Sequence, residues 1–327
     1  MTTLPWQQAH WAHLHSYILQ QRIPQALLIT GCKGLGKFQL AEQFASALLC
    51  EQVQANGEGC GHCHSCLLLK AKTHPDFMLV QPEEGKTTIA IDQIRSLITK
   101  LTLKPQYDRY RVVILNPADK MNNASANAFL KCLEEPNERT ILLLISDRPS
   151  KLPATIRSRC QKIAITQPDK ATVLHWLQTQ GINEDASVLL GLAQGAPLLA
   201  LDYAKQGFVS IRNKCFQQWL ELAKHQTHPI LIAEQWLKLP ETTPLIFWLS
   251  SWVVDLIKCT YQSRAEHLYN SDLYPLLKSS AQSLELKDLY SLYDLLLLSR
   301  VRLETQINKQ SLFEEVLIQW SELNRSR

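Results

Sequence analysis

Residues 31–38 combine the residue types that bind phosphate groups. Their sequence, GCKGLGKF, matches the phosphate-binding loop pattern G-x-x-x-x-G-K-[ST] at every position except the last. Glycines let backbone N–H groups converge on phosphate oxygens, and the dipole of a following helix adds to the attraction. The lysine of such a loop reaches the β- and γ-phosphates of a nucleotide. The candidate phosphate-binding residues are Gly31, Gly34, Gly36 and Lys37.

Two parts of a hydrolytic ATP site are missing from the sequence. Phe38 occupies the position where a Ser or Thr hydroxyl would coordinate Mg²⁺. Asn116 and Pro117 follow an apolar run where acidic residues would hold the metal and orient the attacking water. Asp119 comes three residues too late to replace the first of them. We therefore expect no ATP hydrolysis by this chain, while nucleotide binding without hydrolysis and a ligand-free glycine turn both stay open.

A group of cysteines follows the phosphate loop. Cys60, Cys63 and Cys66 have the spacing C-x₂-C-x₂-C, and Cys50 precedes them by ten residues. Four thiolates bind Zn²⁺ tetrahedrally, and a site closed by four protein ligands is structural. The spacing predicts a structural zinc site, with free loop thiols and an iron–sulfur cluster as alternatives. Three nearby histidines, of which we expect the first two to face solvent, are chemically able to provide the fourth ligand: His62, His64 and His74.

Strands and helices are predicted to alternate around these residues. Apolar runs predict strands at residues 26–30, 77–80, 111–115, 141–145 and 163–165. Helical spacing predicts helices at residues 38–49, at 92–101 with Asp92 as N-cap, and at 124–135 closed by Pro136. This alternation over residues 25–166 predicts an α/β fold with a parallel sheet covered by helices on both faces.

The rest of the chain has a helical pattern. Residues 169–206 predict a small helical unit, and long amphipathic helices follow from about residue 209, including 286–303 and 312–323. We place three domains at residues 1–168, which include the cysteine module at 50–66, at residues 169–207 and at residues 208–327.

Composition limits the classes of function. Apolar residues make up 46% of the 327 positions and charged residues 20%, as in a soluble globular protein. The net charge of +4 permits a nucleic-acid partner without requiring one, because the sequence has no dense basic run. The longest apolar stretch, residues 245–257, is shorter than the ~18 residues of a membrane helix and predicts a buried helix. The N-terminus has no apolar signal sequence, so we expect a cytosolic protein with reduced cysteines.

Three segments resemble a known family. Residues 122–136, NNASANAFLKCLEEP, resemble the segment A-A-N-A-L-L-K-T-L-E-E-P of bacterial clamp-loader subunits. Residues 158–160 resemble their S-R-C motif, and the His-Pro-Asp sequence at 74–76 also fits. The chain thus resembles the AAA+ clamp-loader subunits of DNA polymerase III. Because Phe38, Asn116 and Pro117 stand in place of the expected metal ligands, the chain resembles the members that do not hydrolyse ATP, not the gamma/tau type.

The resemblance implies roles for particular residues. In the family, the arginine of S-R-C projects into the ATP site of a neighbouring subunit, and here that residue is Arg159. A guanidinium is a permanently charged planar donor that suits γ-phosphate oxygens, although an isolated arginine more often has a structural role. Leu198 stands where active relatives carry a nucleotide-contacting arginine, and Ser146 where they carry a polar sensor. The family arrangement also favours Cys50 as the fourth zinc ligand.

The resemblance also implies partners. It predicts an AAA+ module, a lid and a collar in a five-subunit ring with gamma/tau and delta subunits, acting on the sliding clamp and primed DNA. An ATP-hydrolysing, gamma/tau-like subunit is the first alternative. A zinc-dependent nucleic-acid-binding protein is the second, and only Lys70 and Lys72 near the cysteines favour it.

Overall fold

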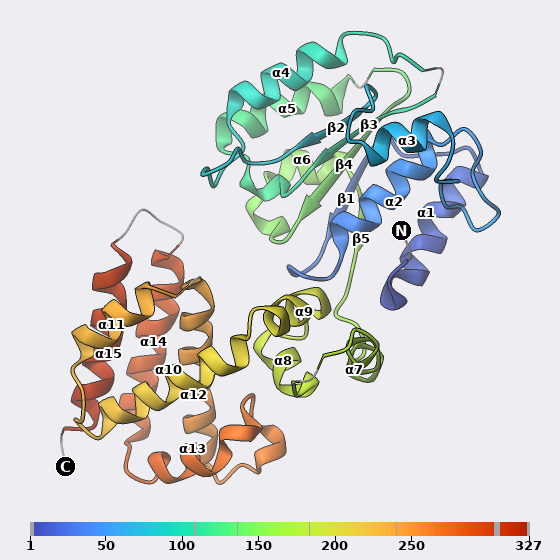
Figure 1. Cartoon of the computed structure of the whole chain (residues 1–327). Helices are drawn as coiled ribbons and strands as arrows, with labels where there is room; N and C mark the ends of the chain where they lie inside the picture. Colours follow the sequence, from blue (N-terminus) through green and yellow to red (C-terminus); the bar gives the residue numbers. More distant parts are fainter. Residues whose placement is uncertain are drawn as a thin grey trace. The chain divides into compact units, whose positions relative to one another are not determined.

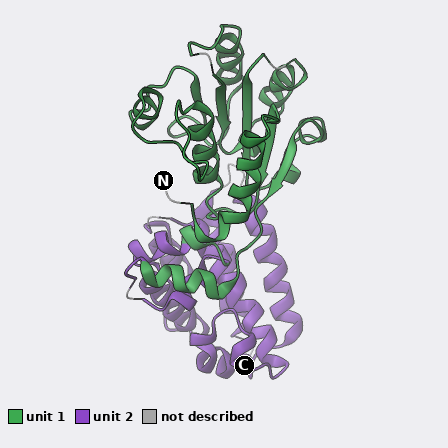
Figure 2. Ribbon diagram, turned by 90° about the vertical axis from the view of Figure 1, so that its right-hand side faces the viewer, with its two compact units in different colours: residues 1–179, 195–199 green, residues 180–194, 200–327 purple. Residues whose placement is uncertain are grey.

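The computed structural model of the chain describes residues 3–107, 109–135, 137–182, 184–239, 241–303 and 308–325. The chain divides into two compact units, shown in different colours in Figure 2. Unit 1 comprises residues 1–179 and 195–199, and unit 2 comprises residues 180–194 and 200–327. Residues of the predicted small helical domain, 169–207, are present in both units, and the boundaries at 168 and 207 stay a prediction.

The sheet of unit 1 has five parallel strands in the order β2-β3-β4-β1-β5. The strands are β1 (Ala26–Thr30), β2 (Phe77–Val80), β3 (Arg111–Leu115), β4 (Thr140–Ser146) and β5 (Gln161–Ala164). The predicted parallel α/β fold is confirmed. Strand β5 begins two residues earlier than the predicted 163–165, because its pairing with β1 already starts at Gln161 opposite Leu27.

Helices cover both faces of this sheet (Figure 1). Leu27 and Ile29 pack in a core with helices α1 (Gln8–Leu19) and α2 (Lys37–Leu49). Leu28 packs in a second core with α4 (Ile91–Leu101) and α5 (Asn123–Glu134). Successive side chains of a strand point to opposite faces, which is why these neighbours enter different cores. The helices of unit 1 up to residue 179 are α1 (Gln8–Leu19), α2 (Lys37–Leu49), α3 (His64–Lys70), α4 (Ile91–Leu101), α5 (Asn123–Glu134), α6 (Ala154–Arg159) and α7 (Lys170–Thr179). Short 3₁₀ helices are η1 (Pro5–Gln7), η2 (Ala118–Lys120) and η3 (Pro149–Lys151).

The predicted N-cap of α4 is wrong. The helix begins at Ile91 with Ala90 as N-cap, and the Gln93 side chain accepts a 2.9 Å hydrogen bond from the Ala90 N–H. Asp92 lies one residue inside the helix, where its exposed carboxylate pairs with Arg95 at 3.3 Å. The predicted helix end at Pro136 falls outside the described residues.

The remaining helices complete the helical pattern. They are α8 (Ala186–Leu192), α9 (Pro197–Lys205), α10 (Phe208–Ala223), α11 (Pro229–Leu237), α12 (Thr243–Thr260), α13 (Tyr274–Ala281), α14 (Leu286–Arg302) and α15 (Lys309–Leu323), with the 3₁₀ helices η4 (Ala265–His267) and η5 (Ser271–Leu273). Helix α12 contains the predicted buried stretch 245–257. Aromatic side chains fill the core of unit 2, where the rings of Trp219 and Trp320 stack with centroids 3.8 Å apart. Within the described chain, no single helix has the length and apolar character to span a membrane, and one bent pair, α8 with α9, meets those criteria jointly.

Candidate functional site

The phosphate loop connects β1 to α2, as predicted. Gly31, Gly34 and Gly36 have φ values of 148°, 83° and 83°, a conformation that favours glycine. Side chains of the same chain also surround the loop. A Cβ added to Gly34 would lie 2.9 Å from the Leu199 Cβ, and one added to Gly36 would meet the Leu4 side chain. The backbone and packing of this loop therefore require its glycines even without a phosphate ligand.

Hydrogen bonds hold the loop from two sides. The carbonyl of Leu35 accepts from Trp6 Nε1 at 3.0 Å and from Gln7 Nε2 at 2.8 Å. The backbone N–H of Leu198 donates to the Gly34 carbonyl at 3.0 Å. The backbone of Leu198 thus holds this segment against the loop. Active relatives are expected to carry an arginine at the position of Leu198.

Lys37 has its partners within the chain. Its side chain is 4% exposed, and its Nζ donates to the Cys32 carbonyl at 2.6 Å. The same Nζ lies 2.7 Å from Asp147 Oδ1. The ammonium group is therefore neutralised by the residue directly after β4, where a phosphate would act in a nucleotide-bound loop.

The end of β3 shows how the acidic residues of this region are used. Strand β3 runs into Asn116 and Pro117, so no carboxylate follows it directly. Asp119, in η2, accepts from Ser146 Oγ at 2.7 Å and from the Asp147 N–H at 3.0 Å. The Asp119 carboxylate thus holds the end of β4, and the hydroxyl of the predicted sensor Ser146 is engaged with it.

Arg159 lies at the amino ends of the parallel strands, whereas the phosphate loop lies at their carboxyl ends. It ends α6, and two residues later Gln161 pairs with Leu27 near the amino end of β1. The phosphate loop follows Thr30 at the carboxyl end of the same strand. At about 3.3 Å per strand residue, roughly 10 Å of strand separates the two edges. Arg159 thus lies at the end of the strands opposite to the phosphate loop of its own chain.

The Arg159 guanidinium has two contacts. Its Nη1 donates to the Thr155 carbonyl at 3.0 Å, and its Nη2 lies 2.9 Å from Glu134 Oε1. The side chain is 38% exposed. Beside it is a cavity of about 260 Å³ lined by Pro24, Gln25, Ala26, Cys132, Leu133, Leu142, Arg159 and Gln161. The Arg159 side chain is therefore partly open to solvent.

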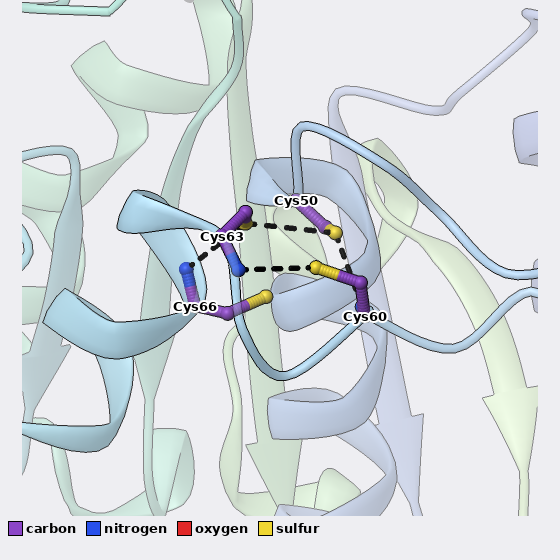
Figure 3. A group of neighbouring side chains, drawn as sticks. All are labelled: Cys50, Cys60, Cys63 and Cys66. Atoms are coloured by element: carbon purple, nitrogen blue, oxygen red, sulfur yellow. Dashed lines mark hydrogen bonds between the residues drawn. The ribbon is translucent and has the colours of Figure 1, made fainter.

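The four predicted cysteines come together (Figure 3). Cys50 follows α2, Cys60 lies in the loop, and Cys63 caps α3, which contains Cys66. All four Sγ atoms lie within 4.8 Å of one another, and those of Cys50 and Cys63 are 3.9 Å apart. Tetrahedral Zn–S bonds of about 2.3 Å would separate the sulfur atoms by about 3.8 Å. The residues present fit a four-thiolate zinc site.

The pKa shifts of the thiols in the cluster differ in direction. Hydrogen bonding from the His62 backbone N–H lowers the pKa of Cys60 to about 6. Burial raises the pKa of Cys66 to about 12 and also raises that of Cys50. Metal binding requires thiolates, so the backbone donors favour it at Cys60, whereas a bound cation would have to offset the burial at Cys66 and Cys50.

The nearby histidines lie outside the group of four thiols. His62 and His64 are exposed, as predicted, and the His62 ring contacts the Cys60 carbonyl at 2.9 Å. His74 is buried, and its Nδ1 accepts from the Asp76 N–H at 3.1 Å. Its Nε2 lies 2.8 Å from the Ser65 Oγ, which donates to the Leu49 carbonyl at 2.7 Å. This chain of hydrogen bonds selects the Nε2–H tautomer and links the start of β2 to the residue before Cys50.

Asp76 has a structural role that the sequence reasoning missed. Its fully buried carboxylate accepts from the backbone N–H groups of Gln106 at 3.0 Å and Tyr107 at 2.9 Å. It also pairs with buried Arg111 at 3.4 Å, and the Arg111 guanidinium donates to carbonyls of the loop after α4. The signal in the sequence is the pair of charged residues at the amino ends of two adjacent apolar strands.

Comparison with known proteins places the chain in a family. A family profile described as "DNA polymerase III, delta subunit" matches residues 6–169, and its C-terminal counterpart matches residues 206–322. A DNA polymerase III subunit delta' from Pseudomonas aeruginosa is 36% identical over 325 residues, which cover 98% of this chain and 97% of the relative. The chain belongs to the DNA polymerase III delta' family.

A second delta' protein agrees with this assignment, and a solved structure is reported beside it. The DNA polymerase III subunit delta' of Yersinia pestis is 33% identical and covers 98% of this chain and 96% of its own length. Among solved structures, a gamma-subunit-related protein of DNA polymerase III from Thermotoga maritima is 14% identical, with 96% of this chain and 99% of that chain covered at a TM-score of 0.44. The predicted resemblance to clamp-loader subunits is confirmed at the level of the family. The chain is thus a DNA-replication protein of the clamp-loader type.

Proposed function

We propose that this delta' family chain is a non-hydrolysing subunit of the DNA polymerase III clamp loader. It helps to load the sliding clamp onto primed DNA in the cytoplasm and donates Arg159 to the ATP site of a neighbouring subunit. The observation that carries this proposal is the position of Arg159 at the sheet edge opposite to the phosphate loop of its own chain. An arginine at this edge serves a neighbour's nucleotide better than its own.

The phosphate loop supports the absence of hydrolysis in this chain. Phe38 and Asn116 offer no anionic or hydroxyl ligand to Mg²⁺. Lys37 is held by Asp147 at 2.7 Å, so a nucleotide phosphate would have to displace that carboxylate. The lack of metal ligands and the ion pair of Lys37 with Asp147 both disfavour ATP hydrolysis by this chain.

The properties of Arg159 suit a role in trans. A guanidinium stays charged at all physiological pH values, and its planar donors match phosphate oxygens. Supplied by a neighbouring subunit, it stabilises the charge that develops on the transferred phosphoryl group. With 38% of its side chain exposed, Arg159 is partly open to solvent in the isolated subunit.

We assign a structural zinc ion to Cys50, Cys60, Cys63 and Cys66. The ion would tie the end of α2 to the start of α3 and would take no part in phosphate chemistry. Its role is to stabilise a loop that has few apolar side chains of its own.

The partners of the chain are the gamma/tau and delta subunits of a five-subunit ring. Helix α14 offers a surface for such contacts, since Tyr290, Leu297 and Val301 are exposed by 46%, 42% and 67%. Spacings of seven and four residues place them on one helix face. An exposed apolar helix face of this kind is typical of a protein–protein interface.

The proposal is tested by comparing the isolated chain with the reconstituted loader. We expect no Mg²⁺-dependent ATP hydrolysis by the chain alone, and we expect clamp loading by the gamma/tau and delta subunits to require its addition. Turnover by the isolated chain that Lys37→Ala abolishes would instead establish a gamma/tau-like ATPase.

A further inference from the structure

Two segments that the sequence analysis singled out separately meet in the structure. Glu134 is the last residue of α5, in the segment LEEP, and Arg159 is the last residue of α6, in the segment SRC. Their side chains form an ion pair of 2.9 Å between Glu134 Oε1 and Arg159 Nη2.

The guanidinium is held from two directions. Nη2 is bound by the carboxylate from α5, while Nη1 donates to the Thr155 carbonyl one turn earlier in α6, at 3.0 Å. Two acceptors on different helices define the plane of the guanidinium as well as its position. The remaining N–H groups of the five-donor fork stay available for another ligand.

We propose that Glu134 is the positioning residue of Arg159, an inference that rests on the proposed donation of Arg159 to a neighbour's ATP site. An arginine side chain has many rotamers, and fixing them when a phosphate arrives reduces the gain from that contact. The Glu134 pair restricts those rotamers in the free subunit, so the neighbour's site receives a guanidinium already oriented.

The charge of Glu134 acts in the opposite direction, since a carboxylate near Arg159 also repels the phosphate. Exposure decides between the two effects. The side chains are 49% and 38% exposed, so solvent screens the repulsion. Solvent also weakens the ion pair, but the pair acts at 2.9 Å and is joined by the hydrogen bond of Nη1 to the Thr155 carbonyl, so we expect the orienting effect to outweigh the repulsion.

The test uses the loader reconstituted with gamma/tau and delta subunits and measures DNA-stimulated ATP hydrolysis. We expect Glu134→Ala to lower kcat by about two- to fivefold with an unchanged KM for ATP. Glu134→Gln retains an oxygen that accepts from Nη2 and should keep most of the rate. Glu135→Ala, which changes the adjacent exposed glutamate, is the matched control and should leave the rate unchanged.

A double-variant comparison separates this inference from the proposed function. If Glu134 acts through Arg159, adding Glu134→Ala to Arg159→Ala causes no further loss of rate. An equal loss in that background would overturn the inference, and so would an unchanged or increased rate in Glu134→Ala alone. An unaltered rate in Arg159→Ala alone would instead contradict the donation of Arg159. Gel filtration of the assembled loader shows that each variant enters the complex.

Discussion

The Lys37 ammonium and the Asp147 carboxylate form an ion pair of 2.7 Å at the carboxyl edge of the sheet. In a hydrolysing P-loop protein the corresponding lysine is directed to nucleotide phosphates. Here Asp147, which follows β4, and the Cys32 carbonyl take that position. The lysine of the phosphate loop has become part of the packing of its own unit.

This pair predicts that Lys37 contributes to stability and not to catalysis. Lys37→Met removes a buried ammonium and leaves Asp147, which is 32% exposed and can be hydrated. We expect the free energy of unfolding of unit 1 to fall by about 1–2 kcal/mol, measured by urea unfolding. The same change should leave the ATPase of the reconstituted loader unaltered. Lys33→Met, in the exposed part of the same loop, is the control, and an equal effect of both variants would argue against the pair.

The cysteine cluster predicts one zinc ion per chain. Cys63→Ser removes a ligand from the centre of the cluster and should reduce the zinc content, measured by mass spectrometry of the purified protein, to near zero. Chelation of the wild-type chain should increase proteolysis within residues 50–66. Cys32→Ser, outside the cluster, should retain the metal. Iron in place of zinc, or full zinc content in Cys63→Ser, would contradict the assignment.

His74 predicts a pH dependence of stability. Burial lowers the pKa of its imidazole below the ordinary value of 6.5. The unfolded chain then binds a proton more readily than the folded chain, so the contribution of His74 is complete above pH 6.5 and is lost as the pH falls below that value. His74→Gln should remove this part of the slope in urea unfolding at saturating zinc, whereas His62→Gln, at an exposed position, should not. Identical slopes in wild type and His74→Gln would exclude this role.

The stacked tryptophans predict a position in unit 2 where a substitution is strongly destabilising. Trp320 is fully buried, stacks on Trp219 at 3.8 Å and donates its Nε1–H to the Trp219 carbonyl at 2.8 Å. We expect Trp320→Ala to destabilise unit 2 by about 3–5 kcal/mol, seen as a lower midpoint of unfolding by circular dichroism. Ile318→Ala, on an exposed position of the same helix, should cost less than about 1 kcal/mol. Equal shifts would show that the stack does not hold α15.

Strands β1 to β4 could be predicted to within one residue because each contains a continuous apolar run, whereas the start of β5 was missed by two residues because it begins with the polar Gln161 and Lys162. Helix ends were less certain, since they depend on local hydrogen bonds. At α4 the Gln93 side chain, and not Asp92, satisfies the N-terminal backbone. The cysteine spacing was informative because Cys60, Cys63 and Cys66 are close in sequence, and the Sγ atom of Cys50 lies with theirs in the structure.

Contacts between distant segments could not be predicted from the sequence. Nothing near Lys37 identifies Asp147 as its partner, because β4 becomes the neighbour of β1 only when the sheet forms. The pairing of Glu134 with Arg159 likewise requires α5 and α6 to pack together. The burial of His74 against Ser65 is of the same kind, and it explains why a residue chemically able to bind zinc is used to hold α3 instead.

We propose that this chain lacks ATP hydrolysis of its own and supplies Arg159 to a neighbour. Single-turnover ATP hydrolysis in the loader reconstituted with Arg159→Ala measures that contribution, with Lys162→Ala as the control at a nearby exposed cation. We predict that Arg159→Ala assembles normally and slows hydrolysis at the site it serves by at least about tenfold, while Lys162→Ala does not. Hydrolysis at the wild-type rate by a fully assembled Arg159→Ala loader would contradict the claim.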